Sequence, residues 1–501
     1  MTDKDKGGGS LSDRLLGGLG WIALGTGMQA LVRLGTLVVL ARLITPSEFG
    51  LFAAVMTVVN ISEILGNVGL APALIQRKDI DRVDMMTAQT LSVCLATTFT
   101  VLVWLFADAI AALFVMPAIV PYLRAVAVIF FMQGLTALAK ARMSRDLHFS
   151  KAAKVASASV VLGYSAVVLP LAWLGWGVWA LVIAQIGQSL VTLLLYSLYY
   201  PPLLGFRFSL SSARRLLSFG IGYSSSTAVA RIAGEADYVI VGRLLGAEAL
   251  GVYSRAFLLI VQQTKRLGQT FSFVLFPVLS SIQDQQERLE SGYGRSMTGA
   301  VFGAALITVP VCILSEWIVL LMLGPQWTAA VVPFALLGLG IVPRTANRIN
   351  AALFQASARL WTSTALQLSN LTLLIAACLI AAPYGLNAVA GAVTGVAWLN
   401  FAVFTAVIVR AQRMRQSLLL GYFLPGLLGA AIITLLALLG RWLAVGIGAG
   451  FWAEGGLLLL SMLLALPIVL ILPGRILGPH GDWLRSFIIA KLRRKKALKH
   501  K

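Results

Sequence analysis

Long apolar runs, separated by short polar connections, dominate the pattern of hydrophobic and polar positions along this chain. A run of about 20 apolar residues is long enough to cross a bilayer as a helix. The pattern predicts fourteen spans, at residues 19–44, 49–70, 84–107, 118–141, 150–174, 177–200, 214–242, 248–278, 297–323, 328–354, 359–382, 387–409, 421–443 and 454–473. The fold class that we expect is an all-α integral membrane protein with about 14 transmembrane helices.

The composition agrees with a membrane protein and argues against most enzyme classes. Of the 501 residues, 59% are hydrophobic and only 12% are charged, whereas a soluble domain carries about 25% charged residues. The three cysteines lie in apolar runs and are typical of core residues, and the three histidines lie in loops or the tail. There is no phosphate-binding P-loop, no H-E-x-x-H and no G-x-S-x-G motif. We therefore expect no cofactor, no metal site, no catalytic residue and no ATP hydrolysis.

The net charge of +21 is distributed unevenly along the chain. Most of the 40 lysines and arginines lie in the tails and in alternate connections, which the positive-inside rule places in the cytoplasm. Both termini are then cytoplasmic, and the basic charge is a topogenic signal, not a nucleic-acid surface. We expect a polar cytoplasmic tail at residues 1–18 and a basic cytoplasmic tail at 476–501, along the anionic inner leaflet. The first apolar run is too long for a signal peptide and should remain as the first span.

Two segments of the chain resemble each other. Residues 42–52 (RLITPSEFGLF) join predicted spans 1 and 2, and residues 243–253 (RLLGAEALGVY) join predicted spans 7 and 8. This similarity predicts a parallel repeat of six plus six spans, related by an axis normal to the membrane. The expected parts are an N-terminal six-helix lobe, a C-terminal six-helix lobe and two extra transmembrane helices, at residues 19–205, 206–410 and 411–475. Two pseudo-symmetric lobes that rock against each other are typical of transporters.

Polar residues recur at helical spacing inside several spans. Charge at membrane depth costs about 2.5–3.5 kcal/mol per residue on insertion scales, so it is kept where it meets water, a partner or a ligand. The residues that we expect to bind substrate are Arg33, Arg231, Arg255, Lys265, Arg266, Arg344, Arg348, Gln29, Gln262 and Asn347. The candidates for ion coupling are Glu63, Glu235 and Asp237.

These polar residues also have structural interpretations. Amides and hydroxyls can hydrogen-bond between helices, and Arg231 and Glu235, one turn apart, can form an ion pair. Arg344 and Arg348 can extend to the membrane interface. Pairing does not account for the whole set, because the cations at membrane depth outnumber the acids. The surplus predicts a water-filled cationic cavity, and arginine favours bidentate binding of phosphate or carboxylate.

Several motifs together resemble the Wzx-type polysaccharide flippases. In chain order they are ARLITPSEFG, GLAPALIQRKDI, GWGVWALV, ADYVIVGRLLGAEALGVYSRA, FPVLSSIQDQQERL and LLGPQW. These flippases belong to the polysaccharide-transport branch of the multidrug/oligosaccharidyl-lipid/polysaccharide (MOP) exporter superfamily, in the colanic-acid exporter-like group. The resemblance covers residues 15–415 and is less clear over the last two spans and the basic tail.

The resemblance implies a lipid-linked oligosaccharide flippase of the bacterial inner membrane, with a MOP/MATE-like fold. Such a protein moves an undecaprenyl-pyrophosphate-linked oligosaccharide, the repeat unit of a polysaccharide, from the cytoplasmic to the periplasmic leaflet. Transport in the family draws on a coupling ion, a proton or sodium. The expected partners are this substrate, membrane lipid and other polysaccharide-assembly membrane proteins, with no nucleic acid.

Two other functions remain open. A multidrug-type exporter of the same superfamily would favour an acidic or neutral cavity for cationic drugs, which Arg33 and the cation surplus disfavour. A membrane glycan polymerase or ligase would require a sizeable extracytoplasmic loop with catalytic polar residues, and the predicted outer connections are short.

Overall fold

The computed structural model describes residues 11–66, 74, 80–201, 208–215, 231–262, 281–282, 285–356, 360–415, 419–464, 468 and 486. Within these ranges the chain is almost entirely helical and contains no strand, which confirms the predicted fold class. Among the described residues, ten helical segments are long and apolar enough to cross a membrane, and two more, Pro46–Ser62 and Phe451–Leu463, are apolar but shorter. The total of fourteen spans stays a prediction, because predicted spans 7 and 8 lie partly outside the described residues.

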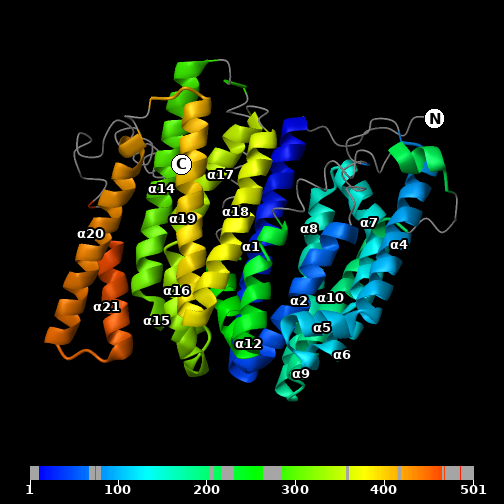
Figure 1. Cartoon of the computed structure of the whole chain (residues 1–501), viewed down its shortest axis with the longest axis horizontal. Coiled ribbons are helices and arrows are strands. Elements are labelled where there is room, and N and C mark those ends of the chain that lie inside the picture. Colours follow the sequence, from blue (N-terminus) through cyan, green and yellow to red (C-terminus); the bar gives the residue numbers. More distant parts are fainter. Residues whose placement is uncertain are drawn as a thin grey trace, which may run out of the picture. The chain divides into compact units, whose positions relative to one another are not determined.

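The contacts divide the chain into two compact units, and unit 1 comprises Met1–Gly251. In unit 1, α4 packs on α7, α1 packs on α8, and α10 packs on α7 and on the π-helical segment η2 (Figure 1). Its described helices are α1 (Leu11–Leu43), α2 (Pro46–Gly66), α4 (Arg82–Leu105), α5 (Ala107–Phe114), η1 (Pro117–Ile119), α6 (Val120–Val126), α7 (Val128–Arg145), α8 (Phe149–Ala158), η2 (Ser159–Ser165), α9 (Ala166–Trp173), α10 (Val178–Tyr199) and most of α12 (Ala236–Phe257).

Unit 2 comprises Val252–Lys501. Its α14 contacts α17 and α20, and α20 runs beside α21 (Figure 1). The described helices are the end of α12, η3 (Leu258–Gln262), α14 (Gln286–Ile313), α15 (Ser315–Met322), η4 (Pro325–Ala330), α16 (Val331–Gly338), α17 (Ile341–Ala356), α18 (Leu360–Ala381), η5 (Ala382–Tyr384), α19 (Leu386–Ala411), α20 (Leu419–Gly446) and α21 (Phe451–Leu463). The sequence repeat places the boundary between the lobes at residues 205/206, and that boundary remains a prediction. The two compact units divide instead at residues 251/252.

The two units share a local geometry, a long helix followed by a short one, that is consistent with the internal repeat. In unit 1, α4 and α5 are separated by one residue, Phe106, with φ −92° and ψ 13°. In unit 2, α14 and α15 are separated by Leu314, with φ −90° and ψ 15°. Both short helices have eight residues, and each is followed by a 3-10 turn that begins with proline, Pro117 or Pro325. The repeat therefore extends beyond the eleven-residue motif found in the sequence.

A backbone break inside α12 supports the same repeat. Gly246 has φ 85° and ψ −179°, so α12 consists of two helical parts joined at this glycine. Only glycine adopts such a conformation without strain. In the repeat, Gly246 corresponds to Thr45, which lies between the end of α1 and the start of α2. The break falls between residues 242 and 248, where hydropathy predicted the end of one span and the start of the next.

Two helices extend beyond their predicted spans. α14 begins at Gln286, eleven residues before the predicted start at 297, because the helix continues past the apolar segment that hydropathy detects, through turns that carry Glu and Arg. Glu290 in this extension accepts a hydrogen bond from the backbone N–H of Arg415 at 3.0 Å. Similarly, α1 begins at Leu11, within the segment predicted as a polar tail.

Candidate functional site

The polar stripe of α1 faces α8 and η2. Gln29 Nε2 donates to Ser157 Oγ at 3.4 Å, and Thr36 Oγ1 donates to Ser165 Oγ at 2.9 Å. Arg33 lies between them on the same face, since the three positions are four and three residues apart, and it is half-buried. The amide and the hydroxyl of this stripe thus link helices within unit 1, which is the structural interpretation that the sequence left open. Arg33 is the charged member of the stripe.

Two polar positions from predicted spans 2 and 7 meet in unit 1. Asn60 Nδ2, on α2, donates to Glu235 Oε1 at 3.1 Å. Glu235 immediately precedes α12, and Asp237 lies in the first turn of that helix. The side chain of Asp237 is only 3% exposed, and its Oδ1 accepts from the backbone N–H of Tyr238 at 3.0 Å. Of the candidate coupling acids, Glu235 accepts a hydrogen bond from an amide on another helix, and Asp237 is buried.

The candidate arginines near α12 differ in exposure. Arg231 is exposed and lies in the helical turn that leads to α12. Arg255 is half-buried in the last turn of α12, and its Nε donates to the buried Ser254 Oγ at 3.4 Å. The two residues belong to different units and are described separately.

Arg344 and Arg348 lie on one face of α17, one helical turn apart, and both are half-buried. Arg344 Nη1 donates to the carbonyl oxygen of Leu337 at 3.0 Å, near the end of α16. Its guanidinium lies over Gly340, where a Cβ would be 2.2 Å from Nη1. Arg344 thus links α17 to the end of α16 across the short connection between them, and glycine at position 340 leaves space for the guanidinium.

The opposite face of α17 is buried and anchors this helix. Ala346, Ile349, Leu353 and Phe354 are at most 2% exposed and belong to a hydrophobic cluster shared with α14 and α19. The helix is therefore amphipathic inside a membrane span, with arginine on the side that does not pack into the cluster.

Asn347 belongs to a polar network inside unit 2. Its Nδ2 donates to Asn400 Oδ1 at 2.6 Å, and its Oδ1 accepts from Asn350 Nδ2 at 3.1 Å. Asn350, fully buried, also donates to Thr405 Oγ1 at 3.0 Å and accepts from the hydroxyl of Tyr293 at 2.8 Å. The network joins α14, α17 and α19 and fixes the rotation of α17 about its axis. It is the main feature that the sequence interpretation missed, although Asn350 follows Asn347 by three residues on the same helix.

Four of the predicted site positions cannot be described. Lys265 and Arg266 lie outside the described residues, and the side chains of Gln262 and Glu63 lie outside them too. Within the described part of the chain, no group of three or more His, Cys, Asp or Glu residues could hold a metal ion. The described site residues are divided between the two units. Unit 1 holds Gln29, Arg33, Arg231, Glu235 and Asp237, and unit 2 holds Arg255, Arg344, Asn347 and Arg348.

Comparison with known proteins shows the family of the chain. Residues 39–332, more than half of the chain, match the family described as "Polysaccharide biosynthesis protein". The chain belongs to this family. One relative is the lipopolysaccharide biosynthesis protein WzxC of Escherichia coli (strain K12), which is 26% identical over 361 residues and covers 70% of this chain and 71% of its own. The resemblance to Wzx-type flippases, predicted from the motifs, is thereby confirmed.

Solved structures show the fold of the chain. The lipid II flippase MurJ in an inward closed conformation is similar with a TM-score of 0.71 and 14% identity, over 89% of this chain and 98% of that one. An inward-facing multidrug resistance MATE family transporter of the MOP superfamily has a TM-score of 0.61 and 18% identity, over 77% and 95%. At these identities the likeness shows the fold alone. The fold is one that these solved multi-pass membrane transporters share.

Proposed function

We propose that this chain is a lipid-linked oligosaccharide flippase of the bacterial inner membrane. It moves undecaprenyl-pyrophosphate-linked polysaccharide repeat units from the cytoplasmic to the periplasmic leaflet. Family membership, the relative WzxC and the MurJ-like fold support this substrate class. The observation that carries the proposal is a pair of half-buried arginines, Arg344 and Arg348, held inside a membrane span by a helix whose other face is packed.

In the proposed mechanism the guanidinium groups bind the pyrophosphate. A guanidinium presents its N–H donors in a planar fork that matches two phosphate oxygens. Arg33 and Arg255, also half-buried in or beside predicted spans, contribute further positive charge for acidic sugars. The polyprenyl chain stays in the lipid, so only the head group crosses through the cationic cavity that the sequence predicts. Alternating access of the lobes at 19–205 and 206–410 carries the head group across.

An inward-moving cation is the proposed energy source. The acids Glu235 and Asp237, and Glu63 on α2, are the candidates to bind a proton or sodium. A membrane potential supplies about 2.3 kcal/mol per elementary charge for each 100 mV. The cytoplasmic placement of both termini, and cooperation with other polysaccharide-assembly membrane proteins, belong to the same proposal.

A multidrug-type exporter is the second candidate, because the MATE transporter shares the fold. Such a transporter would carry cationic drugs, and Arg344, Arg348 and Arg33 would repel them. We therefore favour the anionic, lipid-linked substrate.

Transport by the purified protein tests the proposal. In proteoliposomes, the full-length protein should move a fluorescent undecaprenyl-pyrophosphate-linked oligosaccharide between leaflets, measured by the fraction that a quencher outside the vesicles reaches. Arg348→Gln should slow this movement, and Arg441→Gln is the matched control, because Arg441 lies on α20 and pairs with Glu454 at 3.4 Å. Efflux of a cationic dye with no movement of the lipid-linked oligosaccharide would favour the multidrug exporter instead.

A further inference from the structure

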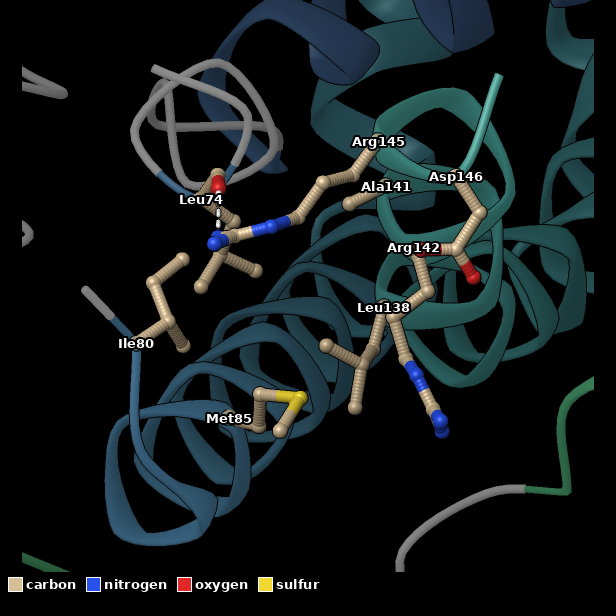
Figure 2. Close-up of a pocket in the computed structure, with 8 residues that line it drawn as sticks. All are labelled: Leu74, Ile80, Met85, Leu138, Ala141, Arg142, Arg145 and Asp146. Atoms are coloured by element: carbon tan, nitrogen blue, oxygen red, sulfur yellow. Dashed lines mark hydrogen bonds between the residues drawn. The ribbon is translucent and has the colours of Figure 1, made fainter. Parts of the chain in front are cut away.

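A pocket of ≈ 210 Å³ lies in unit 1, between the beginning of α4 and the end of α7 (Figure 2). Its aliphatic lining consists of Leu74, Ile80, Met85, Leu138 and Ala141. The described lining also includes three charged residues: Arg142, Arg145 and Asp146. The pocket is therefore amphipathic, with a hydrocarbon wall and a charged rim.

The pocket lies where membrane-spanning segments end. Met85 is in the first turn of the span Arg82–Leu105, and Arg142 and Arg145 are in the last turn of the span Pro117–Arg145. Phospholipid head groups lie at this level of a bilayer, and cationic side chains are favoured there. All five aliphatic lining residues belong to one small hydrophobic cluster or pack against it. A ligand in this pocket therefore contacts both charged and aliphatic side chains.

Contacts within unit 1 hold the two arginines in place. Figure 2 shows Arg145 extending toward Leu74, where its Nη1 donates to the backbone carbonyl oxygen at 3.0 Å. The guanidinium of Arg142 lies 4.8 Å from the centre of the Tyr200 ring, within cation–π distance. Asp146 accepts a hydrogen bond from the hydroxyl of Tyr200. Two guanidinium groups against one carboxylate give the described lining a net positive charge.

We propose that this pocket binds the head group of an anionic membrane phospholipid such as phosphatidylglycerol. The phosphate lies against Arg142, Arg145 adds positive charge to the lining, and the first methylene groups of an acyl chain lie along Met85 and Ile80. The pocket is smaller than the roughly 300–1,000 Å³ of sites that enclose whole small molecules. It therefore accommodates a phosphate and its glycerol, but not an oligosaccharide repeat unit. This is a second lipid site, separate from the residues proposed for the transported substrate.

Lipid retention by the full-length protein tests the proposal. The protein is purified in mild detergent, mixed with equal amounts of phosphatidylglycerol and phosphatidylcholine, and examined by native mass spectrometry. Phosphatidylglycerol should be retained in preference to phosphatidylcholine. Arg142→Gln should weaken its retention about tenfold, the effect of losing one charge-assisted hydrogen bond. Met85→Trp, which fills the pocket without changing charge, should do the same.

Control measurements distinguish a phospholipid site from diffuse attraction, from a free-phosphate site and from the transport site. Arg124→Gln, which breaks an exposed ion pair with Asp108, should leave lipid retention unchanged. Retention that falls in Arg142→Gln but not in Met85→Trp would indicate diffuse electrostatic attraction and overturn the site. Inorganic phosphate, added at equal concentration, should not displace the phospholipid, and displacement would indicate a free-phosphate site. Displacement by undecaprenyl pyrophosphate with loss of transport in both variants would assign the pocket to the transported substrate and overturn the proposal.

Discussion

Gly50 and Gly251 make reciprocal close contacts between α2 and α12. A Cβ built on Gly50 would lie 1.6 Å from the carbonyl oxygen of Ala247, and one built on Gly251 would lie 1.7 Å from the carbonyl oxygen of Pro46. In the sequence repeat Gly50 corresponds to Gly251, and Pro46 corresponds to Ala247. The two copies of the motif thus pack against each other through equivalent positions, as at an isologous interface. Only glycine allows the two backbones this distance.

We expect Gly50→Ala to destabilise the protein, because its methyl group cannot fit beside the Ala247 carbonyl unless the helices separate. Overpacking of this kind costs about 1–3 kcal/mol, and the measurement is the thermal unfolding midpoint of the purified protein. Gly35→Ala is the control: a Cβ there meets nothing within 4 Å, so helix propensity should stabilise α1 slightly. Equal stability of Gly50→Ala and wild type would show that the backbones of α2 and α12 are farther apart at Gly50 than in this structure.

The buried amide network should contribute to stability through Asn350. Replacing it with leucine leaves the hydroxyls of Tyr293 and Thr405 without the amide, at a cost of about 1–3 kcal/mol. Thermal unfolding measures the loss. Thr372→Ala is the matched control, because that exposed hydroxyl bonds only a carbonyl of its own helix and its removal should be nearly neutral. A variant Asn350→Leu as stable as wild type would refute the structural importance of the network.

The two arginines of α17 should behave differently. Arg348→Gln should lower lipid-linked oligosaccharide transport about tenfold with little change in the unfolding midpoint, since it removes one charge-assisted contact to substrate. Arg344→Gln should lower both, because Arg344 also bonds the Leu337 carbonyl near the end of α16. Arg348→Lys keeps the charge but not the bidentate fork, so it should restore transport only in part. Full transport in Arg348→Gln would remove this residue from the substrate site.

Glu235 offers a test of ion coupling. Glu235→Gln retains an oxygen that accepts from Asn60 Nδ2 but removes the charge. We expect the variant to fold normally and to lose the acceleration of transport that an imposed proton or sodium gradient produces in proteoliposomes. Asn60→Leu, which removes the hydrogen bond and keeps the carboxylate, is the paired variant and should retain gradient dependence. The coupling role would be wrong if Glu235→Gln still responded to both gradients.

Tyr200 should make stability depend on alkaline pH. Burial, and then the neighbouring Asp146, raise the pKa of Tyr200 from its usual 10.0 to about 12. The folded state therefore favours the neutral phenol, so this stabilising contribution is complete below pH 10 and is lost as the pH rises toward about 12. The stability difference between wild type and Tyr200→Phe should be constant near neutral pH and shrink above pH 10. His148→Phe, which removes the 2.9 Å partner of the same hydroxyl, should keep the alkaline decline. A difference that stays constant at alkaline pH would contradict the raised pKa.

Much of the helical architecture was predictable because hydropathy over twenty residues is a strong signal. The predicted span at 150–174 and the observed helical run Phe149–Trp173 differ by one residue at each end. The start of α14 was not predictable in this way, since its first turns lie beyond the apolar segment and carry Glu and Arg. Likewise, periodicity placed Arg344, Asn347 and Arg348 on one face of a helix. It could not predict that Asn347 joins a network of hydrogen bonds with Asn350 and Asn400.

The sequence by itself determined the class of protein and the positions of most spans, and it predicts a surplus of cations at membrane depth. These depend on composition and on local spacing, which any chain displays before it folds. Tertiary structure alone decided which polar side chains meet: Asn60 with Glu235, and Asn347 with Asn350 and Asn400. It also decided that the backbone at Gly50 packs against that at Ala247. Residues far apart in the chain become neighbours only through helix packing, and spacing along one helix carries no information about the helix that it will contact.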